Sequence, residues 1–351
     1  MKLHVLSHFF GEIIINPLNT IMNPRTLVSV LNWNSTDDTL ECCRSLIHSG
    51  IDLVDILVID NGSNSSAYQN LQDGLEGIRI IRNSVNQGFA GGHNQAIELA
   101  LALDYQWIWL VNNDCVVEPG QLAKLLEAVE SDARVGIISP VIVLPEAYCI
   151  DTSIPKYQFA GSWFDWKNLQ CIRPTQIGDY LKEETHDGRE IWVTGTALLL
   201  RVSMLKEIGG LENRYFAYYE DNEICIRAQR KNYRVKLVPD VFVEHRSFAR
   251  PFERGPHYFY LISRNGLRFW LDNTPSTFKI NVARRLLFRS VLEAKQLFSN
   301  GYPLQANAVM LGWLHGWIGR LGPFPQRWHE NRFFLFLLGL IPYRIALFFS
   351  K

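Results

Sequence analysis

The chain has 351 residues, of which 47% are hydrophobic and 20% are charged. These fractions are close to the averages for soluble globular proteins, so they argue against a disordered chain and against a protein with many membrane spans. The 35 basic residues balance 35 acidic residues, so the net charge gives no sign of a nucleic-acid-binding protein.

Neither end of the chain predicts a cleaved or membrane-spanning segment. Residues 1–24 lack the basic start, continuous apolar run and cleavage site of a signal peptide, so we expect an N-terminal extension there, with Met22 as an alternative start. Residues 333–349 are strongly apolar, but Pro342 interrupts them before they reach the about 20 residues that span a bilayer. This segment favours lying on a membrane over crossing it.

The six cysteines include no C-x-x-C pair and no other paired spacing. A chain of this length does not need disulfide bonds to fold. We therefore expect reduced cysteines and a cytoplasmic protein.

From Arg25 onward, short apolar runs alternate with helical patterns. The runs predict strands at residues 27–33, 54–60, 78–82 and 107–112. The patterns between them predict helices at residues 39–48, 89–103 and 121–130. Such an alternation predicts right-handed βαβ units in a mostly parallel sheet, which is the α/β class. Ligands bind beyond the carboxyl ends of such strands, where three of these runs end in polar residues.

After about residue 140 the pattern is less regular. An aromatic-rich segment is followed by an apolar run at residues 192–200 and by a helical pattern from about Asp221. From about Thr277 the chain is helical, basic and aromatic. We expect three parts: the N-terminal extension (1–24), one α/β domain (25–273) and a helical C-terminal region (274–351).

Asp60 ends a predicted strand and opens the sequence Asp-Asn-Gly-Ser. At the ligand-binding end of a parallel sheet, its carboxylate can accept hydrogen bonds from a nucleoside base or a ribose. The same four residues are also a common turn composition, because each favours turns for its own reason. Both interpretations stay open from the residues alone.

A glycine-rich segment at residues 83–94 precedes a helical pattern and contains Asn86, Gly88 and Asn94. Helix N-termini attract phosphates because their first N–H groups lack partners, and glycines let a ligand approach the backbone. A tight loop that packs the helix closely on the sheet explains the segment equally well.

The predicted strand at residues 107–112 runs into Asn112, Asn113 and Asp114. A divalent cation that neutralises a diphosphate prefers oxygen ligands, and Asp114 is the natural ligand here. The alternative is a turn or cap residue.

Glu220 and Asp221 stand where a helical pattern begins. Paired carboxylates at a helix entrance can supply a general base that takes a proton from a hydroxyl. Asp is also a good N-cap, but a cap needs no second acid, so the pair favours a functional role. His245 follows a half-apolar strand, where a lone histidine is more often structural than a metal ligand.

In their order along the chain, these motifs resemble those of the inverting family 2 glycosyltransferases with a GT-A fold. The resemblance covers about residues 27–268, and it is particularly to the rhamnosyltransferase-like branch that acts on bacterial surface polysaccharides. Its carriers are Val-Leu-Asn-Trp-Asn after the first strand, Val-Ile-Asp-Asn-Gly-Ser, Asn-x-Gly-Phe-Ala-Gly-Gly-x-Asn, Asn-Asn-Asp, Gly-Thr-Ala, Glu-Asp and the late histidine.

The resemblance implies roles for the individual residues. Asp114 is similar to the family's metal-binding acid, although Asn112 replaces the first acid of the usual D-x-D motif. Asp221 is similar to the catalytic base, with Glu220 as its acidic partner, and His245 has the spacing of a metal-binding histidine in galactan-building members. The residues expected at the substrates are Asn34, Asp60, Asn86, Gly88, Asn94, Asn112, Asn113, Thr194 and Gly195.

The resemblance therefore implies a glycosyltransferase of the hexosyltransferase type that moves a sugar, such as rhamnose, from a dTDP- or UDP-sugar to a saccharide or lipid-linked acceptor hydroxyl. Mg²⁺ or Mn²⁺ would be held by Asp114 and His245. The alternatives are a nucleotidyltransferase, which would release pyrophosphate, and a non-catalytic scaffold subunit that binds nucleotide sugars.

The basic, Trp-rich C-terminal region predicts peripheral contact with the inner face of the cell membrane. The alternative is a helical subdomain that buries these aromatic side chains internally.

Overall fold

The computed structural model describes residues 24–145, 157–174, 177, 178, 180, 189–246, 254–325 and 343–350. Residues 1–23 of the expected extension, Cys149 and most of the apolar segment predicted near the C-terminus lie outside these ranges.

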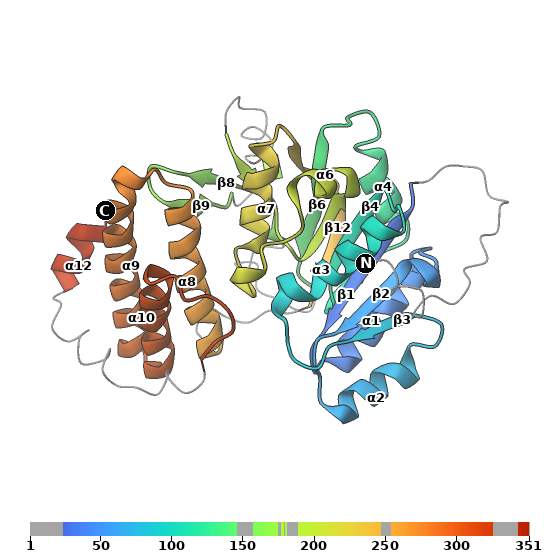
Figure 1. Cartoon of the computed structure of the whole chain (residues 1–351), viewed down its shortest axis with the longest axis horizontal. Coiled ribbons are helices and arrows are strands. Elements are labelled where there is room, and N and C mark those ends of the chain that lie inside the picture. The colour runs from blue at the N-terminus through green and yellow to red at the C-terminus, as the bar shows by residue number, and fades with distance from the viewer. Residues whose placement is uncertain are drawn as a thin grey trace, which may run out of the picture.

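The main sheet has nine strands, in the order β3-β2-β1-β4-β11-β6-β12-β5, with β7 paired to β6, and helices flank it (Figure 1). Its strands are β1 (Thr26–Asn32), β2 (Ile56–Asp60), β3 (Arg79–Arg82), β4 (Trp107–Asn112), β5 (Cys115–Val117), β6 (Val135–Val143), β7 (Tyr157–Phe159), β11 (Ala197–Arg201) and β12 (Arg234–His245). A second, smaller sheet has the order β10-β8-β9, with strands β8 (Ser162–Asp165), β9 (Gln170–Ile172) and β10 (Ile191–Trp192).

The flanking helices of the α/β part are α1 (Thr36–His48), α2 (Ser65–Gly74), α3 (Gly88–Ala102), α4 (Gln121–Glu127), α6 (Val202–Ile208) and α7 (Glu220–Gln229). Short 3₁₀ helices occur at η2 (Leu53–Asp55), η4 (Asn213–Tyr215) and η6 (Ser276–Phe278). The α/β class and the mostly parallel sheet predicted from the sequence are confirmed.

The four parallel strands that form one half of the main sheet explain why the sequence pattern could be recognised. β3, β2, β1 and β4 are parallel neighbours, and every residue of β2 is buried. Parallel strands covered on both faces read as continuous apolar runs rather than alternating ones. The register aligns Asn32 with Asp60 and Leu31 with Asn112, so the polar ends of β1, β2 and β4 lie at one edge of the sheet.

Several predicted boundaries were wrong by a few residues. The second strand begins at Ile56 because residues 53–55 form a 3₁₀ turn closed by Asp55 N and Asp52 O. The first helix begins at Thr36 rather than at residue 39. Its first turn was missed because the residues there are polar and carry no apolar repeat. The apolar run at residues 192–200 is divided between β10 and β11.

The C-terminal helices α8 (Pro256–Asp272), α9 (Lys279–Ser299), α10 (Pro303–Trp317) and α12 (Tyr343–Ser350) form a bundle beside the α/β part (Figure 1). In α10, Gly312 and Gly316 allow close approach to α8, because a Cβ at either position would lie within 2.4 or 2.7 Å of a carbonyl oxygen of α8. Trp313 is half-buried and donates to Ala283 O (3.3 Å), whereas Trp317 is exposed, so the aromatic side chains of this bundle are divided between its interior and its surface.

Helix α8 contributes to both hydrophobic cores of the molecule. Its first turns, with Phe259 and Tyr260, pack in the core of the bundle, and its last turns, with Phe269 and Trp270, pack in the core of the sheet. The boundary predicted at residue 273 follows this shared helix and stays a prediction. Among the described helices, none has both the length and the apolar character that a bilayer span requires.

Candidate active site

Asn32 links the loops that follow β1 and β2 through hydrogen bonds. Its Nδ2 donates to Asp60 Oδ1 (2.9 Å) and to Ser63 Oγ (3.2 Å), while its Oδ1 accepts from Thr39 Oγ1 (2.8 Å). Both N–H groups of the amide are therefore used within the protein, and the turn after β2 is fixed against α1.

Asp60 and Asn34 lie at this edge of the sheet, in different surroundings. Asp60 is 0% exposed, and its Oδ2 accepts from Ser63 N (3.3 Å) and lies 3.8 Å from Arg82 Nε. Asn34 is exposed, has a φ of 54°, and its Oδ1 accepts two bonds from Asn64 (2.9 and 3.0 Å). Both side chains shape the turn, and a contact between Asp60 and a nucleotide base would require this turn to open.

Asn61, which the sequence prediction did not single out, organises the glycine-rich segment. Its Nδ2 donates to Asn86 Oδ1 (3.0 Å) and Gly88 O (2.9 Å), and its Oδ1 accepts from Asn83 Nδ2 (3.1 Å) and Gln87 N (2.9 Å). The sequence did contain a signal for Asn61, because this residue belongs to the Asp-Asn-Gly-Ser turn in which Asp60 was noted.

Gly88 and Asn94 connect the start of α3 to residues 211–216. Gly88 has a φ of 75°, and a Cβ there would lie 2.2 Å from Phe216 O. Asn94 donates to Leu211 O (2.8 Å) and to Asn213 Oδ1 (2.5 Å), and it accepts from Leu211 N (2.8 Å). These contacts match the tight-loop interpretation, and the expected contribution of both residues to a donor pocket stays a prediction.

Asn112, Asn113 and Asp114 follow β4 as expected, but they have different partners. Asn113 donates to Thr39 Oγ1 (3.0 Å) and Ser35 O (3.3 Å), which turns its side chain toward α1. Asp114 turns the other way, toward the end of β12, and keeps 21% of its side chain exposed.

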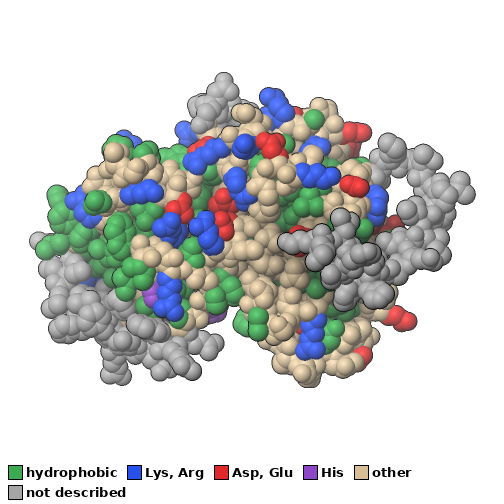
Figure 2. Space-filling model, in the orientation of Figure 1, with side chains coloured by type: hydrophobic (Ala, Val, Ile, Leu, Met, Phe, Trp, Pro, Cys, Tyr) green, Lys and Arg blue, Asp and Glu red, His purple; other side chains and the backbone are tan. Residues whose placement is uncertain are grey.

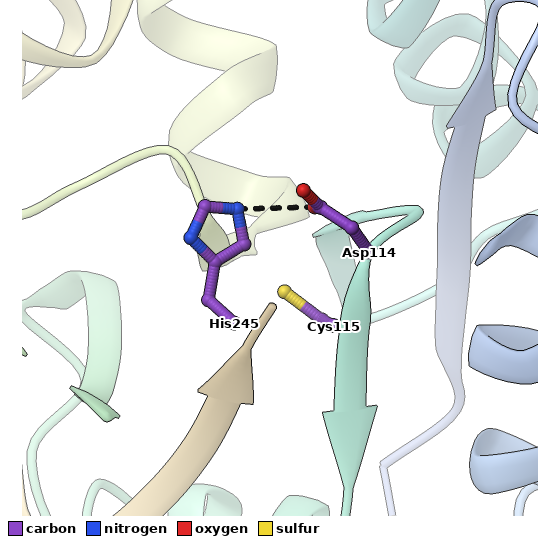
Figure 3. A group of neighbouring side chains, drawn as sticks. All are labelled: Asp114, Cys115 and His245. Atoms are coloured by element: carbon purple, nitrogen blue, oxygen red, sulfur yellow. Dashed lines mark ion pairs between the residues drawn. The ribbon is translucent and has the colours of Figure 1, made fainter. Parts of the chain in front are cut away.

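His245 ends β12, opposite Cys115 in the sheet register, and its ring faces Asp114 (Figure 3). Nε2 lies 3.0 Å from Asp114 Oδ1 and 3.3 Å from Asn112 Nδ2. On the other side of the ring, Nδ1 lies 2.6 Å from Gln158 Oε1. Gln158 had no sequence signal, because it belongs to a three-residue strand far from both partners along the chain.

This arrangement fits a metal ion. With the Nδ1 proton donated to Gln158 Oε1, Nε2 and Asp114 Oδ1 face one another at 3.0 Å as two acceptors, and a cation bound by both would satisfy this arrangement. Carboxylate oxygen with imidazole nitrogen suits Mn²⁺ well, and carboxylate oxygen suits Mg²⁺.

The Sγ of Cys115 lies within 4.8 Å of the ligand atoms of Asp114 and His245 (Figure 3). Burial, together with the charge of Asp114, raises the pKa of this thiol well above its usual value. Mg²⁺ and Mn²⁺ prefer oxygen and nitrogen ligands to sulfur, so the carboxylate and the imidazole are the better ligands for these ions.

Asp221 lies in the first turn of α7. Its Oδ2 accepts from Gly195 N (3.0 Å) and its Oδ1 from Asn222 N (2.8 Å). Each oxygen keeps capacity for a further bond, so the carboxylate is oriented without being saturated. Glu220 beside it is 5% exposed, and among the described residues its Oε2 has no hydrogen-bond partner.

The surroundings of the two carboxyl groups oppose ionisation to different degrees. Burial and the neighbouring Asp221 raise the pKa of Glu220 well above its usual value. Burial also raises the pKa of Asp221, but the bonds from Gly195 and Asn222 and the charge of Arg173 oppose this shift. These surroundings therefore favour ionisation of Asp221 over ionisation of Glu220.

Residues 194–196 connect the two acidic groups. Gly195 binds Asp221, and Thr196 O accepts from Asn112 N (2.9 Å). Thr194 Oγ1 lies 3.1 Å from Thr196 Oγ1. The carboxylate at the start of α7 and the Asp114–His245 pair are thus neighbours in one site, although more than a hundred residues separate Asp114 from Asp221.

Two family models match this chain. One, described as glycosyl transferase family group 2, matches residues 107–347, which is more than half of the chain. The other, described as glycosyl transferase family 2, matches residues 28–148.

Two curated proteins and one solved structure illustrate the similarity. A low-salt glycan biosynthesis hexosyltransferase of Haloferax volcanii is 26% identical over 311 residues, covering 86% of this chain and 93% of that protein. An N-acetylglucosaminyl-diphospho-decaprenol L-rhamnosyltransferase of Mycobacterium tuberculosis is 26% identical over 203 residues, covering 55% of this chain and 66% of that protein. A mannosyltransferase of Pyrobaculum calidifontis, solved with GDP-Man and Mn²⁺, superimposes with a TM-score of 0.51 at 14% identity, covering 93% of this chain and 85% of the other.

Proposed function

The chain belongs to glycosyl transferase family 2, in its rhamnosyltransferase-like branch and with a GT-A fold, and we propose that it transfers a sugar with inversion from a nucleotide-diphosphate donor to an acceptor hydroxyl. The observation that carries this proposal is the link through residues 194–196, which joins the oriented carboxylate of Asp221 to the facing side chains of Asp114 and His245.

Asp221 acts as the general base. It takes the proton of the acceptor hydroxyl, whose oxygen then bonds to the anomeric carbon as the bond from that carbon to the diphosphate breaks. Because Glu220 stays protonated, it adds no second negative charge beside the reacting oxygen. One displacement of this kind inverts the configuration of the anomeric carbon.

Asp114 and His245 would hold Mg²⁺ or Mn²⁺, which when bound neutralises charge on the departing nucleoside diphosphate. Gln158 keeps the His245 ring in the tautomer that offers Nε2 as a ligand. Asn112, which occupies the first acidic position of the usual motif, adds a neutral amide beside this pair rather than a second negative charge.

The donor would lie over the loops after β1 and β2 and the start of α3, where the turn at Asp60 and the N-terminus of α3 face the same edge of the sheet. A dTDP- or UDP-sugar is the expected donor, with a hexose such as rhamnose as its sugar. The acceptor would enter past residues 192–197, on the side of Asp221.

We also propose that the C-terminal helices contact a membrane that carries a lipid-linked acceptor. Eight of the fourteen exposed large hydrophobic side chains in the described residues lie between Phe278 and Phe348. Figure 2 shows hydrophobic side chains gathered over these helices, with Lys and Arg side chains around them. Exposed apolar groups beside basic ones favour an anionic lipid surface.

The main test is product analysis with the full chain. The protein is incubated with UDP-, dTDP- and GDP-sugars and a saccharide or lipid-linked acceptor, with and without Mn²⁺. We expect release of a nucleoside diphosphate and a product whose anomeric configuration, measured by NMR, is inverted. Release of pyrophosphate would identify a nucleotidyl transfer instead, and a retained configuration would contradict the single displacement.

The membrane contact is tested by flotation with vesicles that contain anionic lipid. We expect Ile280→Asp and Phe348→Asp to reduce flotation, whereas Val54→Asp, an equally exposed apolar position in the α/β part, leaves it unchanged. Equal flotation of all three variants would contradict the proposal.

A further inference from the structure

The segment immediately before the acidic pair has an unusual backbone. Phe216, Tyr218 and Tyr219 have φ values of 69°, 69° and 75°, in the left-handed region that bulky residues rarely adopt. This conformation is strained in a residue with a bulky side chain, and it persists only where the surroundings hold it. Something must therefore fix this segment, and Tyr219 leads directly into Glu220 and Asp221.

Helix α8 provides the contacts that hold it. The Nδ2 of Asn265 lies 3.0, 2.7 and 2.7 Å from the carbonyl oxygens of Tyr215, Ala217 and Tyr218, so its two hydrogens are shared among three acceptors. Its Oδ1 accepts from Arg264 Nε (2.8 Å), which sets the orientation of the amide.

Arg264 strengthens the same contact. Its NH2 donates to Tyr215 O (2.7 Å), its NH1 donates to Gly322 O, and its guanidinium lies over the ring of Tyr260. Both Arg264 and Asn265 are 0% exposed, and among the described residues no carboxylate lies within ion-pair distance of Arg264. A buried charge that is balanced only by carbonyl groups is expensive, so its place at this segment indicates a need for fixed geometry.

The two ends of the segment are held by different parts of the molecule. At one end, Phe216 O accepts from Ala90 N (3.3 Å), which fixes it to α3. At the other end, Tyr219 packs over Gly266, where a Cβ would lie 2.9 Å from the Tyr219 hydroxyl. The end that sets the direction of the acidic pair therefore depends on α8.

We propose that Asn265 and Arg264 are positioning residues, which hold residues 215–219 in the left-handed conformation that aims Glu220 and Asp221 at the substrates. The proposal rests on the proposed function, in which Asp221 is the base. It makes α8, the first helix of the C-terminal bundle, part of the catalytic apparatus.

The test compares three variants of the full chain. Asn265→Ala removes the donor to three carbonyls, and Gly266→Ala displaces Tyr219 while keeping those bonds. Ser263→Ala is the matched control, because it removes a bond of similar burial from α8, to Val309 O (2.8 Å), that does not reach the segment.

We expect both Asn265→Ala and Gly266→Ala to lower kcat about 10-fold or more, since misplacement by about 1 Å can cost a hundredfold. The KM for the donor should change less, and the acid limb of the kcat–pH profile should shift as the surroundings of Asp221 change. Ser263→Ala should keep the wild-type kcat and profile. If Asn265→Ala does not fold, the kcat and the kcat–pH profile of Gly266→Ala test the proposal instead. We expect this variant to fold, because alanine is favoured over glycine within a helix.

Hydrogen–deuterium exchange of peptides that cover residues 213–223 separates this proposal from the proposed function. We expect faster exchange in Asn265→Ala than in Ser263→Ala, whatever the role of Asp221. Wild-type turnover of Asp221→Asn would overturn the proposed function but not this loosening. Wild-type kcat and pH profiles in the Asn265 and Gly266 variants would overturn the positioning role.

Discussion

The donor-side loops, at residues 32–34, 60–64 and 83–94, and the acid site, formed by Asp114, His245, Glu220 and Asp221, use polar side chains in opposite ways. In the loops, the amides of Asn32, Asn61 and Asn94 form hydrogen bonds within the protein. In the acid site, Asp221 keeps free lone pairs and Glu220 keeps an unpartnered oxygen. Under the proposed function, the loops build the shape of the site and the acid site performs its chemistry, so leftover hydrogen-bonding capacity would distinguish the two roles.

The largest effect is expected at Asp221. Asp221→Asn keeps the size of the side chain but removes its basicity, so we expect kcat to fall about 10²–10⁴-fold. Burial raises the pKa of Asp221, so the wild-type kcat should rise with pH through a value above the 3.8 usual for aspartate. The control is Asp104→Asn, an exposed residue with a φ of 52° that asparagine tolerates. An equal loss of kcat in Asp221→Asn and Asp104→Asn would contradict the role of Asp221 as the base.

Next in size is the effect of Gln158, which supports the acid site without belonging to the donor-side loops. Gln158→Ala removes the acceptor for His245 Nδ1, so we expect Mn²⁺ affinity, measured by titration of activity, to fall about 10–100-fold. Gln158→Glu should keep or increase this affinity, because a carboxylate accepts the same proton. Gln72→Ala, on the exposed face of α2, should change nothing. Unchanged affinity in Gln158→Ala would argue against His245 as a ligand.

Asn61 tests the donor-side loops. Asn61→Ala removes four hydrogen bonds from the glycine-rich segment, so we expect the free energy of unfolding to fall by about 1–3 kcal/mol, with kcat changed less than in Asp221→Asn. Urea denaturation measures the first quantity, and Asn70→Ala on α2 is the exposed control. If Asn61→Ala kept its stability but lost most of its kcat, the result would indicate that these loops take part in the reaction itself.

The smallest expected effect is that of Glu220→Gln, which should raise the stability of the protein rather than lower it. Its pKa is raised in the folded state, so its contribution to stability is complete below about 4.5, the usual value, and is lost as pH rises toward the raised value. Glu220→Gln does not titrate, so near neutral pH it should be more stable than the wild type by about 1–2 kcal/mol. The advantage should shrink on acidification, and Glu127→Gln, at an exposed position, should show neither effect. A pH-independent difference would contradict a neutral, buried Glu220.

The fold was largely predictable, because the parallel strands are continuous apolar runs and the polar residues follow them directly. β4 was predicted at its observed bounds, and its register with β1 brings Asn112 to the expected edge. Asp114 and Asp221 could be singled out because one follows a strand and the other begins a helix, whereas His245 received its expected role from the family resemblance. Their roles at the substrates stay predictions.

The supporting residues could not be predicted, because their roles depend on contacts between distant parts of the chain. Gln158 reaches His245 across 87 positions, and Asn265 reaches Tyr218 across 47. Neither belongs to a local pattern, and a lone amide in a strand or a helix gives no signal until the fold brings its partner close. The left-handed backbone before Glu220 is also invisible in the sequence, since tyrosine and phenylalanine do not favour it.

Because α8 belongs to both hydrophobic cores, it limits how the two parts of this chain can be recombined with those of its relatives. A chimera joined before Pro256 would exchange the helix that holds residues 215–219, so the foreign helix would need matching donors to the same carbonyl oxygens. A chimera joined after Asp272 keeps that helix and exchanges only α9 onward. We therefore expect acceptor or membrane preference to be transferable between relatives at this second junction, and the catalytic centre to travel with α8.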